Sequence, residues 1–106
     1  MGTDLAEQWP GFDNLSRSIG DSHVERLKPV FLNLLDRDAS KEPPLPFLIF
    51  EAIGRELGYP TDPNWLLEWA WTVDMEYDGV WDALQTTKND GQTFEDVLEE
   101  RASLRR

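Results

Sequence analysis

The chain has 106 residues, of which 40% are hydrophobic, so it has the length and the apolar content of one globular domain and is too short for two. Its 21 acidic residues outnumber 10 lysines and arginines, and a net charge of −11 disfavours direct binding to nucleic acids and to anionic membranes. The absence of cysteine excludes disulfides, thiolate metal sites and thiol nucleophiles.

The N-terminal part of the chain predicts one short helix. We expect a single acidic helical domain over residues 1–106, of which residues 1–12 are irregular. Asp13 has a side chain suited to a helix cap, so a helix is expected over residues 14–19. Gly20 would end this helix, since glycine adopts the left-handed conformation at low cost.

A longer helix is expected over residues 22–36, where apolar residues recur at helical spacing after the capping residue Asp21. Pro29 lies inside this segment and predicts either a kink or a later start of the helix. Residues 38–46 contain three prolines among polar residues, which is typical of a loop.

Two further helices are predicted in the middle of the chain. Residues 47–57 are apolar enough for a buried helix, and Gly58 would end it. Asp62 followed by a proline is typical of the start of the next helix. Trp65 and Trp69 share one face of that helix, so we expect both in the core.

The C-terminal third combines an acidic stretch over residues 74–90 with a last helix over residues 94–104. A turn is expected at residues 89–91, and Thr93 can cap the last helix. No segment predicts a strand convincingly. The expected fold is therefore all-α, a compact bundle of four to five short helices.

Within this acidic stretch, residues 74–82 carry a group that can supply an oxygen ligand at every second position. The groups are Asp74, Glu76, Asp78, the Val80 carbonyl and Asp82, with Gly79 among them. This spacing resembles an EF-hand calcium loop, in which oxygen ligands occupy alternate positions and glycine takes the sixth. The resemblance implies a degenerate EF-hand-like helix pair, a calcium-binding or adaptor domain, with a calcium site at those residues. Gln85 replaces the glutamate that closes such a loop, which weakens calcium binding.

Enzymatic chemistry has less support in the sequence. His23 is the only histidine, and we expect it to face solvent in the first turn of its helix. One histidine cannot supply the two Glu-x-x-His motifs of a bundle-type di-iron site. A carboxylate–Mg²⁺ nucleotide hydrolase remains as the enzymatic alternative, because acids also crowd the last helix at Glu95, Asp96, Glu99 and Glu100.

Three of the five tryptophans lie in acidic or turn contexts, where core and interface roles are equally open: Trp9, Trp71 and Trp81. Aromatic side chains rimmed by acids are typical of a surface that anchors a partner protein. The leading hypothesis is a small, cytoplasmic, non-enzymatic module that binds or inhibits a basic partner protein, such as one that binds nucleic acid, by presenting carboxylates as a nucleic-acid mimic. The predicted partner-binding residues are Trp71, Asp74, Glu76, Asp78, Trp81 and Asp82. The oligomeric state stays open.

Overall fold

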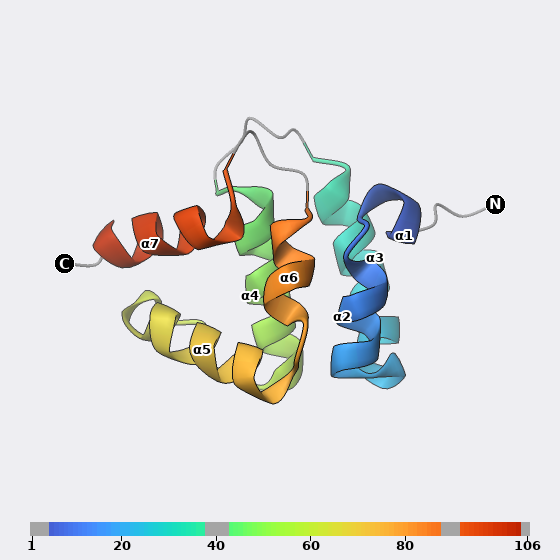
Figure 1. The fold of residues 1–106 in the computed structure, drawn as a ribbon, viewed down its shortest axis with the longest axis horizontal. Helices are drawn as coiled ribbons and strands as arrows, with labels where there is room; N and C mark the ends of the chain where they lie inside the picture. The colour runs from blue at the N-terminus through green and yellow to red at the C-terminus, as the bar shows by residue number, and fades with distance from the viewer. Residues whose placement is uncertain (1–4, 38–42, 88–91, 105–106) are drawn as a thin grey trace.

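The computed structural model describes residues 5–37, 43–87 and 92–104, and over these ranges it contains helices and no strand. The helices are α1 (Leu5–Gln8), α2 (Phe12–Ile19), α3 (Asp21–Leu35), α4 (Leu45–Leu57), the 3-10 helix η1 (Pro63–Trp65), α5 (Leu66–Glu76), α6 (Val80–Gln85) and α7 (Phe94–Leu104) (Figure 1). The all-α class is confirmed. The short helices α1 and α6 are additions to the five helices expected from the sequence.

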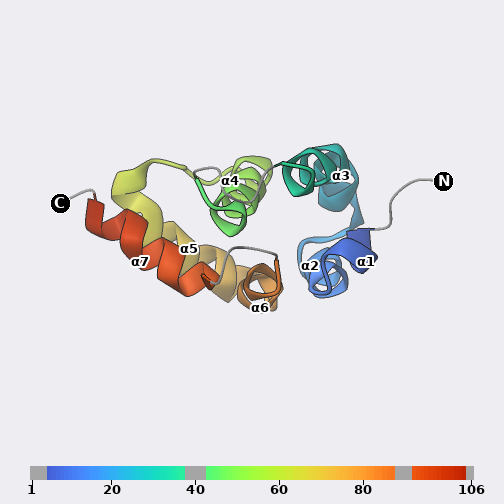
Figure 2. The ribbon, with the colours of Figure 1, turned by 90° about the horizontal axis from the view of Figure 1, so that it is seen from above.

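Helices α1, α2 and α3 form one end of the molecule and α5 and α7 the other, with α4 and α6 between them (Figures 1 and 2). The closest helix pairs are α3 with α4 and α2 with α6. The molecule is flat, with extents of 45 × 30 × 18 Å. The turn between α5 and α6 lies against α2, where Gly79 comes close to Asn14.

Trp9 joins the N-terminal helices to α6. Its side chain is fully buried, and its indole N–H donates to the Ala83 carbonyl at 2.6 Å. Its ring also contacts Phe12 and Phe31, with centroids 5.9 and 5.4 Å away. Trp9 is thus a core residue. The expectation of irregular structure over residues 1–12 is wrong for α1 and for the first residue of α2, while residues 1–4 lie outside the described ranges.

Several predicted helix ends are confirmed. Gly20 follows α2 with a φ of 94°, and Gly58 ends α4 in the left-handed conformation with φ 86° and ψ 15°. Residues other than glycine rarely adopt these angles. At the start of α7, the Thr93 hydroxyl accepts a hydrogen bond from the Asp96 amide at 3.2 Å, which is the geometry of a helix cap.

Two proline positions refine the predicted boundaries. Helix α3 begins eight residues before Pro29 and passes through it, so the alternative of a late start near Pro29 is wrong. Helix α4 begins at Leu45, two residues earlier than expected, because Pro46 fits a first turn in which the missing N–H would have had no helical partner. The turn predicted at residues 89–91 lies outside the described residues.

Trp65 and Trp69 have different environments, although a shared core position was expected. Trp69 is buried, whereas Trp65 is 51% exposed, so the expectation is wrong for Trp65. The chain first makes the 3-10 turn η1 and becomes α-helical at Leu66. A 3-10 turn has fewer residues per turn than an α-helix, and this shifts Trp65 off the buried face. Asp62 does begin the turn, since its carboxylate accepts the Asn64 amide at 2.9 Å.

Gly54 provides the space in which Trp69 packs. The Trp69 ring lies 3.8 Å from Phe50 in a parallel stack, and a Cβ on Gly54 would stand 2.6 Å from two of its ring atoms. We expect Gly54→Ala to lower the free energy of unfolding by about 1–3 kcal/mol, because the stacked ring cannot move away cheaply and overpacking outweighs the gain in helix propensity. Urea unfolding followed by circular dichroism measures this. In a Trp69→Leu background the cost should disappear, and an equal cost in both backgrounds would contradict the clash.

Candidate functional site

Helix α5 has a buried face and an exposed apolar face. Its buried side chains are Leu66, Trp69, Ala70 and Val73. On its exposed side lie Leu67, Trp71 and Met75, which are 36%, 59% and 82% exposed. Four-residue intervals place these three side chains along one side of the helix, and we name them the α5 stripe.

Trp71 is held in place by a second indole. Its ring stacks on that of Trp81 from α6, with centroids 5.8 Å apart and an interplanar angle of 21°. Trp81 in turn meets the buried Phe94 edge to face at 5.1 Å. Because Trp81 is partly buried and anchored to the core, Trp71 is presented at the surface in a fixed orientation.

Asp74 orients the helix that carries Trp81. Its carboxylate accepts the backbone N–H of Trp81 at 3.2 Å, which satisfies one of the unpaired amides in the first turn of α6. Gly79 makes the preceding turn with a φ of 92°, a conformation that favours glycine. The structure therefore brings three of the predicted site residues together: Trp71, Asp74 and Trp81.

The other three predicted site residues gather on a different side of the turn. Glu76, Asp78 and Asp82 line an open hollow of about 600 Å³, together with Asn14, Arg17, Ser18 and Gly79. Glu76 also accepts a hydrogen bond from the hydroxyl of Tyr59. Burial of that hydroxyl, followed by its bond to the Glu76 carboxylate, raises the pKa of Tyr59 to about 12.

The predicted calcium ligands have other contacts in this structure. Helix α5 continues to Glu76 and α6 begins at Val80, so three residues join the two helices. Asp74 caps α6 and Glu76 bonds Tyr59. Among the described residues, no three His, Cys, Asp or Glu side chains are grouped so that they could hold a metal ion. Calcium binding stays a prediction, for which the described geometry supplies no ligand set.

The charge around the α5 stripe has one sign in the sequence. From residue 62 to residue 87 there are six acidic residues and no lysine, arginine or histidine. Five of these acids are exposed, namely Asp62, Glu68, Glu76, Asp78 and Asp82, and Asp74 is half-buried. The apolar stripe is thus flanked in the sequence by carboxylates without a neighbouring base, and in the fold Arg17 of α2 lines the hollow together with Glu76, Asp78 and Asp82.

A scan against protein-family models, a search of curated proteins and a search of solved structures each found no match to this chain. Within the described residues, no helix has the length and apolar character needed to cross a membrane. The function must therefore be inferred from the chain's own residues.

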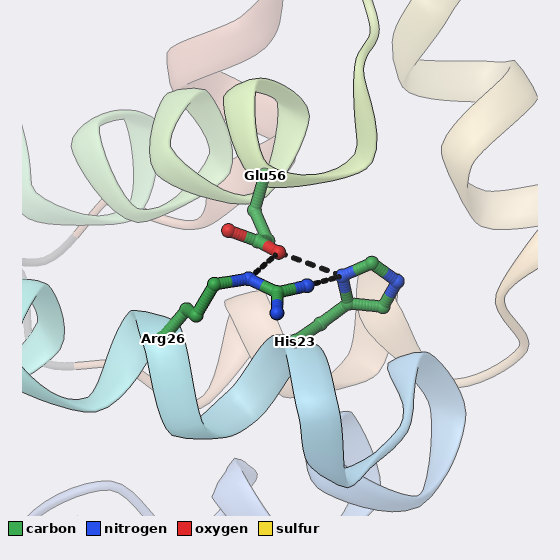
Figure 3. A network of polar contacts seen from close by, with 3 residues as sticks. All are labelled: His23, Arg26 and Glu56. Carbon is green, nitrogen blue, oxygen red and sulfur yellow. Dashed lines mark hydrogen bonds and ion pairs between the residues drawn. The ribbon is translucent and has the colours of Figure 1, made fainter.

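A second polar cluster joins α3 to α4 (Figure 3). The Nδ1 atom of His23 lies 2.8 Å from the Glu56 carboxylate and 3.3 Å from a terminal nitrogen of Arg26. An ionised carboxylate can only accept, so we assign the hydrogen of the shorter bond to Nδ1. Arg26 Nε donates to the same oxygen at 2.6 Å. The expectation that His23 faces solvent is wrong, because the approach of α4 leaves its side chain 30% exposed. No sequence spacing relates residues this far apart, so their pairing could not be predicted.

Glu56 gives this cluster a pH dependence. The hydrogen bond from His23, assisted by Arg26 and opposed by burial, lowers the pKa of Glu56 from its ordinary value of 4.5. A lowered pKa stabilises the fold above the unfolded-state value and loses that contribution as pH falls through the folded-state value. We expect the free energy of unfolding to fall with acidification below about pH 4.5 more steeply in the wild type than in Glu56→Gln.

Urea unfolding at several pH values between about 3 and 7 measures the difference between these two proteins. Glu51→Gln provides a matched control on the same helix, because Glu51 makes no ion pair within the described residues. Its pH dependence should follow that of the wild type. Parallel curves for the wild type and Glu56→Gln would contradict the role given to the His23–Glu56 bond.

Leu67 and Met75 belong to the exposed apolar face but were missed among the predicted site residues. A usable signal was present, because they stand four residues before and after Trp71. Residues four apart lie on one side of a helix, and this side differs from the one that carries Leu66, Trp69 and Val73.

Proposed function

We propose that the chain is a non-enzymatic interaction module that binds a basic partner protein through the α5 stripe and the acids beside it, and that it can inhibit the partner by covering its basic surface. The observation that carries this proposal is the exposed position of Trp71, which stacks on the anchored Trp81 within a segment devoid of basic residues.

The composition of this surface supports a protein partner. Interfaces commonly place aromatic and methionine side chains at their centre, within a polar rim. Trp71 and Met75 supply such a centre, and Glu68, which follows Leu67 on the same helix, supplies an exposed acid beside it. A tryptophan held by packing before binding loses little conformational freedom when a partner covers it.

The charge supports a basic partner. A net charge of −11 attracts a basic surface over several ångströms and speeds its association. The same charge repels nucleic acid. A protein that itself binds nucleic acid would present a complementary basic surface. The carboxylates of this chain would then bind where the phosphates of the nucleic acid bind.

The test begins with a partner captured at low salt on the immobilised chain, purified, and titrated by calorimetry. Capture alone does not support the proposal. The dependence of the affinity on salt and on particular acidic residues tests it. We expect the affinity for the partner to fall about tenfold or more between about 50 and 200 mM salt. Salt-independent binding would contradict it.

Two charge variants separate the proposed surface from net charge. Glu68→Gln, Asp78→Asn and Asp82→Asn together remove three of the five exposed acids of the segment that carries the α5 stripe. Glu7→Gln, Asp13→Asn and Asp21→Asn remove three exposed acids from α1, α2 and α3 at the other end of the molecule. The first triple variant should weaken binding at least about tenfold more than the second. Equal weakening would mean that net charge alone attracts the partner.

A further inference from the structure

The α5 stripe is a linear apolar ridge with a helical repeat. Leu67, Trp71 and Met75 are spaced by about 6 Å along the helix axis, since an α-helix rises about 1.5 Å per residue. A second helix presents its own apolar side chains at intervals of three and four residues, which gives a similar repeat. Ridges of this kind pack into the grooves of a facing helix.

A helix fits this face better than an extended peptide does. Extended peptides bind by adding a strand to the exposed edge of a sheet. The described residues contain no strand, so they offer no such edge. The remaining way to cover a row of exposed apolar side chains on α5 is through the side chains of the partner, and an amphipathic helix supplies them on one face.

The charges on α5 disfavour a second copy of this chain as the occupant. Two copies meeting at α5 would bring Glu68 and Asp74 of one molecule close to the same acids of the other, and α5 itself contains no base that could offset this repulsion. Lysine and arginine beside the apolar face of a partner helix would instead lie against these acids, and their long side chains can reach them.

We propose that the partner binds through an amphipathic basic helix that lies along α5, with its apolar face on Leu67, Trp71 and Met75 and its basic residues toward the α5 acids Glu68 and Asp74. This inference rests on the proposed function, and it adds the structural class of the segment that is recognised. Met75 gives the surface some adaptability, because its unbranched side chain adjusts to different apolar shapes.

Two synthetic peptides of about 18 residues and identical leucine and lysine composition provide the probe. One has its leucines at helical spacing, and the other alternates leucine and lysine. Binding is measured by fluorescence anisotropy of the labelled peptide against the full chain. We expect the helical-spacing peptide to bind at least about tenfold more tightly than the alternating peptide.

Trp71→Ala and Met75→Ala keep the net charge, so they separate docking on the stripe from charge attraction. Each should weaken the helical-spacing peptide by about tenfold or more, while Trp65→Ala should leave it within about threefold. Equal affinity for the two peptides, or unchanged affinity in both stripe variants, would overturn the helix inference. If the captured partner still binds in a salt-sensitive and acid-dependent way, the proposed function survives that result. If that binding also fails, both are overturned.

Discussion

Replacing Trp9 with alanine is expected to remove about 3–5 kcal/mol from the free energy of unfolding, the range found when a large aromatic side chain is deleted from a core. Trp9 is completely buried, contacts the rings of Phe12 and Phe31, and bonds the Ala83 carbonyl on α6. A domain of this size has a total stability of about 5–15 kcal/mol. The variant should therefore lose a substantial fraction of its stability.

Trp9→Phe separates packing from hydrogen bonding at this position. The Ala83 carbonyl also accepts from the hydroxyl of Thr86 at 2.8 Å and from its amide at 3.2 Å, so it keeps donors when the indole N–H is lost. We expect a cost of about 1–2 kcal/mol, well below that of Trp9→Ala. Urea unfolding followed by far-ultraviolet circular dichroism measures both variants. A loss under about 1 kcal/mol for Trp9→Ala would contradict the core position.

Local sequence signals predicted the helices whose ends have a specific residue chemistry. Gly20, Gly58 and Thr93 each mark a helix end that the structure confirms, because capping depends on a few neighbouring residues. Short helices gave no such signal. Helix α1 has four residues and α6 has six, which is too short for a recognisable period, and packing stabilises such helices more than propensity does.

The roles of the tryptophans required tertiary structure. The context of Trp9 left core and interface open, and only the approach of α6 decides for the core. A helix that begins after Asp62 with an α-helical period predicts a core position for Trp65. The chain there forms a 3-10 turn instead, so the prediction fails. The stack of Trp71 on Trp81 joins two helices across a turn, and its geometry depends on the Asp74 cap and on Gly79. Periodicity within one helix carries no information about such a pair.

The predicted site residues fall into two groups, one around the Trp71–Trp81 stack and one around the hollow beside α2, because two helices contribute to this surface. Neighbouring positions on a short helix point in different directions, so Trp81 meets Trp71 while Asp82 lines the hollow beside α2. The sequence places these residues in one acidic segment, but the helical turn of α6 separates them. Electrostatic attraction acts from both groups at long range, whereas close contact with a partner requires an apolar centre. That centre is Trp71.

Replacing Trp71 with alanine is expected to weaken binding of the captured basic partner by at least about 30-fold, which corresponds to the loss of about 2 kcal/mol at an interface hot spot. The effect should fall mainly on the dissociation rate, because the net charge that steers association is unchanged. Surface plasmon resonance at fixed salt measures both rates. The stability should fall by about 1 kcal/mol at most, since the side chain is 59% exposed and loses mainly its stack on Trp81.

Trp65→Ala is the matched control for this experiment. Trp65 is exposed to a similar extent, at 51%, but it lies in the 3-10 turn before α5 and outside the α5 stripe. Its loss should change the affinity less than about fivefold, because interface residues away from the central anchor contribute little. Similar losses in both variants would indicate that any exposed indole on this acidic surface attracts the partner. A loss confined to Trp71→Ala would locate the contact at the stack that Trp81 and Asp74 hold in place.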